Sequence, residues 1–348
     1  MRKRVNRMRG NGLAWVAVIA LFTGPFARGG DEPMKTNLLE AGTGGYATYR
    51  IPGIVITKSG TILAYCEARR SGTLDWDTID VMLRRSTDGG KTWDKPRVIA
   101  TAPEGTSPNP APIARHVHQT GKTTNNPVAI VDPQSGAVVF LYCINYQQCY
   151  AMRSEDDGKT FSKPVEITAT FEKFRPEYDW KVIATGPGHG IRLTSGRLVV
   201  PVWLSTSTGN NAHHPSCVST IYSDDGGKTW NRGDIVAGNT PETPDPNETA
   251  IAQAADGRTI LNIRNESKKN RRLVSSSKDG ATQWSKPAFD EALFEPVCFA
   301  SLAAVPGTEN RLLFCNPDSS DSVSKSVSHP RRNLTVRLSN DGAATWPV

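Results

Sequence analysis

The chain has 348 residues and a formal net charge of +7, with 41 Lys and Arg against 34 Asp and Glu. That length suits one large all-β domain or two ordinary domains. Residues 1–30 hold six basic residues and no acidic residue, so the rest of the chain carries 35 basic against 34 acidic side chains. This nearly neutral remainder argues against a broad basic surface that binds nucleic acid.

The first predicted element is a leader peptide over residues 1–30. It combines a basic start, the apolar run "LAWVAVIALF" at 13–22, and small residues from Gly24 to Gly30. This order is typical of a secretory signal peptide, and the apolar run is too short to span a bilayer. The first cysteine is Cys66, so no cysteine follows the run that could carry a lipid anchor. We therefore expect a secreted or periplasmic protein without a membrane anchor, whose folded domain covers residues 31–348.

Strand patterns dominate the rest of the chain. Three stretches each predict two strands joined by a short turn that contains glycine: 53–69, 191–205 and 252–265. The 30 glycines and 24 prolines are spread along the chain, and no helical stripe persists for more than a few residues. The predicted class is therefore all-β.

Six cysteines permit disulfides in an exported protein but do not demand them. Cys143 and Cys149 flank "INYQQ" in a predicted hairpin and form the best candidate pair. Cysteine spacing does not match a zinc site. His116 and His118 lie on one strand face without a third ligand nearby, so a solvated pair is favoured over a metal site.

One turn motif occurs five times in the sequence. Its copies are "STDGGKTW" (86–93), "SEDDGKTF" (154–161), "SDDGGKTW" (223–230), "SKDGATQW" (277–284) and "SNDGAATW" (339–346). The Asp and Ser side chains can accept hydrogen bonds from the turn's backbone, Gly permits a positive φ, and the aromatic residue can pack onto the sheet. A calcium loop is the weaker interpretation, because no bidentate Glu follows at the required place.

The interval between copies predicts a repeated supersecondary unit. The copies start 68, 69, 54 and 62 residues apart, with short strands between them. Such a pattern is typical of a β-propeller, whose blades are four-stranded sheets. Ligand sites of propellers lie where loops of several blades meet, so we expect functional residues that are scattered in the sequence.

The stretch "TYRIPGIV" at 48–55, together with the repeated turn, resembles the exo-α-sialidases, also called neuraminidases, of the bacterial secreted type with Asp-box (BNR) repeats. The resemblance runs from about residue 36 to the C-terminus. It implies a six-bladed propeller and a retaining exo-α-sialidase that removes terminal sialic acid from glycoconjugates. It further implies a monomer that acts on sialylated glycans without a cofactor or a metal.

The resemblance also implies site residues at the matching motifs. Three arginines are expected to hold the substrate carboxylate: Arg50, Arg264 in segment 247–265, and Arg331 in segment 328–339. Asp75 in segment 66–93 is the expected acid/base, and Glu248 in segment 247–265 is the expected catalytic glutamate. Arg332 is the alternative to Arg331, and Asp77 and Asp80 are the alternatives to Asp75. Asp80 alternates with apolar residues, which favours a structural role. Arg69 is expected to contact a ring hydroxyl of the sugar or to pair with a neighbouring acid.

These residue types suit the chemistry. Three arginines can hold the carboxylate of sialic acid by forked hydrogen bonds that lysines cannot match. Arg50 and Arg264 lie within apolar strands, where a charge needs a reason. A carboxylate nucleophile would be repelled by the substrate's own carboxylate. Sialidases differ from most glycosidases in that their nucleophile is a tyrosine. Glu248 would take the proton of that tyrosine, and Asp75 would protonate the leaving oxygen.

The family's tyrosine is expected after the last Asp box, yet the sequence ends at "TWPV". Tyr46, Tyr49 and Tyr178 lie in other segments. We therefore expect a C-terminally truncated propeller with an incomplete last blade. The alternative is a propeller that binds sialic acid without hydrolysing it. A scaffold for protein–protein contacts is a third possibility, but it leaves the arginines in apolar strands unexplained.

Overall fold

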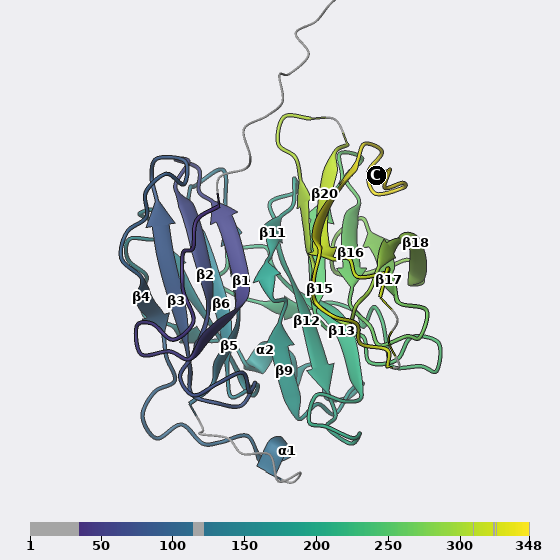
Figure 1. Cartoon of the computed structure of the whole chain (residues 1–348), viewed down its shortest axis with the longest axis horizontal. Helices are drawn as coiled ribbons and strands as arrows, with labels where there is room; N and C mark the ends of the chain where they lie inside the picture. The colour runs from purple at the N-terminus through teal and green to yellow at the C-terminus, as the bar shows by residue number, and fades with distance from the viewer. Residues whose placement is uncertain (1–34, 114–121, 309, 323, 325, 348) are drawn as a thin grey trace, which may run out of the picture. The chain divides into compact units, whose positions relative to one another are not determined.

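The computed structural model describes residues 35–113, 122–308, 310–322, 324 and 326–347 (Figure 1). The predicted signal peptide, His116 and His118 lie outside the described residues. The chain divides into two compact units, Met1–Asn37 and Leu38–Val348. Residues 35–37 of the first unit form no regular element, and everything below concerns the second unit.

Five sheets follow one another along the chain, coloured from purple to yellow in Figure 1. The first contains β1 (Thr48–Ile56), β2 (Ile62–Arg69), β3 (Ile79–Ser86) and β4 (Arg97–Ala100). The second contains β5 (Thr124–Val131), β6 (Val138–Ile144), β7 (Gln148–Ser154), β8 (Val165–Glu166) and β10 (Gly188–His189). The third contains β9 (Val182–Thr185), β11 (Ile191–Arg192), β12 (Leu198–Ser205), β13 (Ser216–Ser223) and β14 (Asn231–Arg232).

The fourth sheet contains β15 (Thr249–Gln253), β16 (Thr259–Ile263), β17 (Arg271–Ser277) and β18 (Ala288–Phe294). The fifth contains β19 (Ser301–Ala304), β20 (Leu312–Pro317) and β21 (Leu334–Ser339). Two four-residue helices, α1 (Pro110–Ile113) and α2 (Ala169–Glu172), complete the regular elements of the described ranges. None of the helices in these ranges has the length and apolar character needed to cross a membrane.

The predicted all-β class is confirmed, and the sheets form the blades of a β-propeller arrangement, with five blades in the described ranges. Strand order follows the chain in the first, fourth and fifth blades, and almost all neighbouring strands are antiparallel; in the second blade β10 lies beside β5, and in the third β9 pairs with β12. The three predicted strand pairs are confirmed as β1 with β2, β11 with β12, and β15 with β16. One strand pair is parallel: β10 pairs with β5 of the second blade, although it lies in sequence between β9 and β11 of the third blade.

The repeated turn begins at the last residue of β3, β7, β13, β17 and β21, and its own Ser and Asp side chains hold it, as the sequence predicts. In the first copy, Asp88 accepts hydrogen bonds from the backbone N–H of Thr92 at 2.9 Å and from its hydroxyl at 2.6 Å. The Ser86 hydroxyl donates to Asp88 and accepts from the N–H of Gly90. In the second copy, Asp157 replaces a glycine and still adopts a φ of 56°. The carboxylate oxygens are thus engaged by the turn itself.

The apolar core lies between neighbouring blades. Separate clusters join the first blade to the second, the second to the third, the third to the fourth, and the fourth to the fifth. Among the described residues, no such cluster joins the fifth blade to the first. Instead, β1 exposes Ile54 and Ile56, which are 61% and 62% accessible, and β21 exposes Leu334 and Val336, at 75% and 63%.

The candidate disulfide is not formed. Cys143 and Cys149 face each other across β6 and β7, as the predicted hairpin requires, but both are free thiols. Both side chains are completely buried in the cluster between the second and third blades, where a free cysteine packs as a small apolar residue.

Candidate active site

All six predicted site residues line one cavity of about 460 Å³. Its lining comes from every blade, and the predicted members are Arg50, Arg69, Asp75, Glu248, Arg264 and Arg331. The expectation that functional residues would be scattered in sequence and gathered in space therefore holds for these positions. Their individual catalytic roles remain predictions.

A β-bulge in β1 presents Arg50. The register with β2 shifts between Arg50 and Gly53, and Ile51 has a positive φ of 56°. Gly53 leaves room for the ring of Tyr65, which would lie only 2.2 Å from a Cβ at that position. Bulges redirect side chains at functional sites. Arg50 donates to the Thr73 carbonyl at 2.9 Å and lies 3.6 Å from Asp75.

Arg69 connects two carboxylates. Its side chain is 1% exposed and donates to Glu67 at 2.6 Å and to Asp75 at 2.8 Å. Burial raises the pKa of Glu67, although Arg69 and the backbone N–H of Asn126 oppose that effect. Burial would also raise the pKa of Asp75, but Arg69, followed by His213 and Arg50, lowers it below the ordinary value. Arg69 therefore pairs with neighbouring acids, one of the two expected roles.

Of the three candidate acids, Asp75 is the one that lines the cavity. Asp80 is buried, accepts from the Tyr46 hydroxyl at 2.7 Å and pairs with Arg70 at 2.9 Å, which is a structural role. Asp77 is also buried and caps the N–H of Thr78 at 2.6 Å.

Glu248 and Arg264 form an ion pair at 2.7 Å, and their side chains are 15% and 16% exposed. Glu248 precedes β15 and Arg264 follows β16, and the backbone N–H of Arg264 donates to the Glu248 carbonyl at 3.1 Å. This strand-end pairing holds both side chains at the cavity. The Arg264 Nε–H is buried and has no hydrogen-bond partner among the described atoms.

Arg331 lies at the cavity, whereas Arg332 does not. Arg331 donates to the Val297 carbonyl at 3.1 Å. Arg332 instead forms a fork with Asp321 at 3.0 and 3.1 Å, with both side chains more than half exposed. The geometry thus favours Arg331 over its alternative.

The sequence analysis missed an aromatic wall of the cavity, formed by Trp76, Tyr146, Trp203 and His213. His213 lies 5.2 Å from Trp76, 4.9 Å from Tyr146 and 5.3 Å from Trp203, measured between ring centroids. Burial lowers the pKa of His213 to about 4, so its ring is neutral in ordinary buffers. The available sequence indications were the position of Trp76 beside Asp75 and of Tyr146 within "INYQQ".

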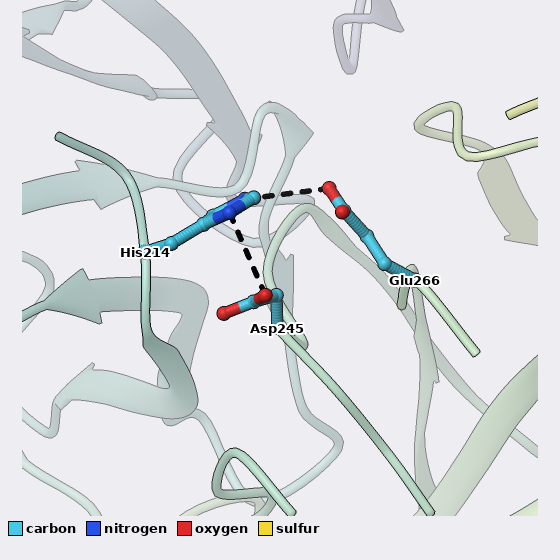
Figure 2. A group of neighbouring side chains, drawn as sticks. All are labelled: His214, Asp245 and Glu266. Atoms are coloured by element: carbon cyan, nitrogen blue, oxygen red, sulfur yellow. Dashed lines mark ion pairs between the residues drawn. The ribbon is translucent and has the colours of Figure 1, made fainter. Parts of the chain in front are cut away.

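A second missed group, at the edge of the cavity, contains His214, Asp245 and Glu266. Figure 2 shows the His214 ring between the two carboxylates, with Nδ1 3.5 Å from Asp245 and Nε2 3.3 Å from Glu266. The three offer atom types that metal ions accept, and these atoms lie within 4.8 Å of one another. The two ring nitrogens face different carboxylates, however, and this arrangement suits a protonated imidazole better than a single shared metal ion.

Comparison with known proteins agrees with this fold. The family model described as BNR repeat-like domain matches residues 60–348. A sialidase of Bacteroides fragilis is 30% identical over 91% of this chain and 57% of its own length. A sialidase of Micromonospora viridifaciens is 29% identical over 92% of this chain and 48% of its own length. The solved Hadza microbial sialidase Hz136 is 28% identical, with a TM-score of 0.70 over 88% of this chain and 59% of that chain.

The blades and their repeated turn define the class of propeller proteins with BNR repeats. Within that class, the chain belongs to the exo-α-sialidase family. It spans only 57% and 48% of the two curated relatives compared here.

Proposed function

We propose that the protein is a retaining exo-α-sialidase that hydrolyses terminal sialic acid from glycoproteins, glycolipids and oligosaccharides. The observation that carries this proposal is the meeting of three arginines from three blades, Arg50, Arg264 and Arg331, in one cavity with the carboxylates of Asp75 and Glu248. Guanidinium groups that converge from different directions match a carboxylate by charge and by hydrogen-bond geometry.

Binding of the substrate carboxylate prepares Glu248. In the ligand-free protein, Glu248 accepts a hydrogen bond from Arg264. A ligand carboxylate competes for this guanidinium, which leaves Glu248 free to accept a proton.

Hydrolysis then takes two steps. A tyrosine oxygen attacks the anomeric carbon and passes its proton to Glu248, while the glycosidic C–O bond breaks and the leaving oxygen takes a proton from the protonated form of Asp75. That form is the minor one near neutral pH because, despite burial, Arg69 lowers the pKa of Asp75. Water next attacks the same carbon, Asp75 takes the water's proton, and the released tyrosine oxygen recovers its proton from Glu248. Two inversions retain the configuration.

A sixth blade completes the proposal. The exposed apolar side chains on β1 and β21, and the lack of an apolar cluster between the first and fifth blades in the described ranges, support a further sheet at this position. Burying such faces is what stabilises propeller blades. We place the nucleophilic tyrosine on this blade.

We also propose that the protein is exported, as a secreted or periplasmic monomer, and meets sialylated glycans outside the cytoplasm. The basic start, apolar run and small residues of positions 1–30 support this proposal. N-terminal sequencing of the protein recovered from outside the cytoplasm should find a start near residue 31.

The decisive experiment combines turnover with binding. The protein, purified with the proposed sixth blade that carries the tyrosine, is tested with a fluorogenic α-sialoside, the anomer released first is identified by NMR, and binding of N-acetylneuraminic acid is measured by calorimetry. Fluorophore release with the α-anomer formed first supports the proposal. Binding without release would instead support the non-hydrolysing alternative, and absence of both would reject a sialic acid site.

A further inference from the structure

We propose that His214 is a positioning residue of the cavity. When its ring takes up a proton, the hydrogen-bond partner of Nδ1 changes from Asn211 to Asp245, and the charged ring strengthens binding of an anionic sugar. This inference rests on the proposed function and makes the ligand affinity of the same site depend on pH. His214 belongs to the loop 206–215 between β12 and β13, which also carries His213 into the aromatic wall.

Charged groups reach His214 from two other segments. Asp245 comes from the segment that precedes β15, and Glu266 follows β16, close to Arg264. His213, Asn210 and Asn211 face it from its own loop. The Nε2–H can donate to Glu266 in both protonation states of the ring, so that contact does not change with pH.

The Nδ1 atom is where the two states differ. It lies 3.0 Å from the amide nitrogen of Asn211, 3.2 Å from the amide oxygen of Asn210 and 3.5 Å from Asp245. A neutral ring accepts from Asn211 at Nδ1. A charged ring donates there instead, so it must turn to an oxygen of Asp245 or Asn210, and the Asn211 amide loses its acceptor.

Asn211 transmits this change to the cavity. Its side-chain oxygen accepts from the backbone N–H of His213 at 2.7 Å, so a displaced Asn211 moves the residue whose ring packs against Trp76, Tyr146 and Trp203. The same proton also adds a positive charge beside Glu266, whose carboxylate lies 3.8 Å from Arg264. Offsetting the Glu266 charge leaves Arg264 more attractive to a ligand carboxylate.

The surroundings of His214 set the direction of the pH effect. Burial lowers its pKa, but Glu266 and then Asp245 outweigh burial and Arg264, so the pKa lies above the ordinary 6.5. More of the His214 rings are therefore charged near pH 6.5 than in a free histidine, and the charge is lost as the pH rises through the higher pKa of the folded protein. His213, with its pKa at about 4, does not titrate in that window.

The test measures affinity and protonation separately. Calorimetry with N-acetylneuraminic acid at about pH 6 and about pH 8.5 brackets the histidine titration. We compare wild type with His214→Gln, which keeps a neutral donor toward Glu266, and with Asp245→Asn. Asp224→Asn, which removes an exposed partner of Arg197 away from the cavity, is the matched control. Histidine ring resonances give the pKa of His214 by NMR, with and without ligand.

We expect wild type and Asp224→Asn to lose affinity about fivefold toward the higher pH, at the lower end of typical coupling between sites. His214→Gln should bind equally at both, and ligand should raise the pKa of His214. Asp245→Asn should lower that pKa even without ligand. Unchanged pH dependence in His214→Gln, or an unaltered pKa in Asp245→Asn, would overturn the inference. Wild type that binds at neither pH would instead refute the proposed function, while the NMR comparison still decides whether Asp245 controls His214.

Discussion

Arg331 and Arg332 are neighbours in the sequence but have different surroundings, and this difference gives a matched pair of variants. Arg331→Ala should weaken binding of N-acetylneuraminic acid by about 1.5–3 kcal/mol, the scale of hydrogen bonds to a charged group. Arg332→Ala removes only an exposed ion pair with Asp321 and should leave the affinity unchanged. Calorimetry measures both. A larger loss in Arg332→Ala would exchange the roles of the two residues.

Asp75 and Asp77 provide a second pair. As a general acid, Asp75 matters most when the leaving group is poor, so Asp75→Asn should slow alkyl sialosides by about 10²–10⁴-fold and aryl sialosides much less. Asp77→Asn keeps the buried shape and should affect both substrates alike. Initial rates on the two substrate types check the prediction. Equal slowing of both substrates by Asp75→Asn would remove it as the acid.

The charged residues of the site were predictable, and its aromatic wall was not. Arg50 lies within a strand and Arg264 directly follows the apolar strand β16, and the contrast between their charge and their apolar neighbours is visible in the sequence alone. Trp76, Tyr146 and Trp203 look like ordinary apolar residues, because aromatic side chains are expected in the core of any sheet. Only the packing of three blades brings them together.

At the scale of single elements, the repeated turn predicts how stability depends on pH. Hydrogen bonds from the threonine of the same turn hold the pKa at about 2, against an ordinary 3.8, for Asp88, Asp156, Asp225 and Asp341. A lowered pKa contributes stability that is present above pH 3.8 and is lost as the pH falls toward 2. Denaturant unfolding followed between about pH 5 and pH 2 should show this loss.

A substitution in the third copy of the turn isolates the effect. Asp225→Ala should lower the free energy of unfolding by about 1–2 kcal/mol, as expected when a side chain that caps several backbone N–H groups is lost. It should also flatten the acid limb of the stability curve. Asp224→Ala, one residue earlier, removes a surface partner of Arg197 and should change stability by less than about 1 kcal/mol. Equal losses in both variants would mean that the turn acts only through surface charge.

Strands that follow from a local sequence pattern were predictable, whereas strand pairings that depend on a neighbouring blade were not. The strand pairs at 53–69 and 252–265 follow from alternation and a glycine turn. The inner edge of the third blade is divided between β9 and β11, since the intervening β10 pairs with β5 of the second blade. No local pattern in the sequence encodes that exchange.

For the whole molecule, the exposed faces of β1 and β21 predict self-association wherever nothing covers them. Large uncovered apolar surfaces and free strand edges favour contacts between molecules. Val336→Lys should therefore reduce association of the purified protein in sedimentation velocity. Val165→Lys, at a similarly exposed valine on β8, serves as the control and should not. If both substitutions act equally, added charge alone explains the effect.

The residues that line the cavity come from all five described blades, and this determines at which stage of synthesis the cavity can form. Arg50 and Arg331 belong to the first and fifth blades, so their meeting needs nearly the full length of the chain. Contacts between such distant segments carry a loop-closure cost and form slowly. A ribosome-bound chain can complete its early blades, but it cannot assemble the three-arginine pocket until the segment that carries Arg331 has been synthesised. Ligand binding is therefore a property that the protein acquires only after all five described blades have been synthesised.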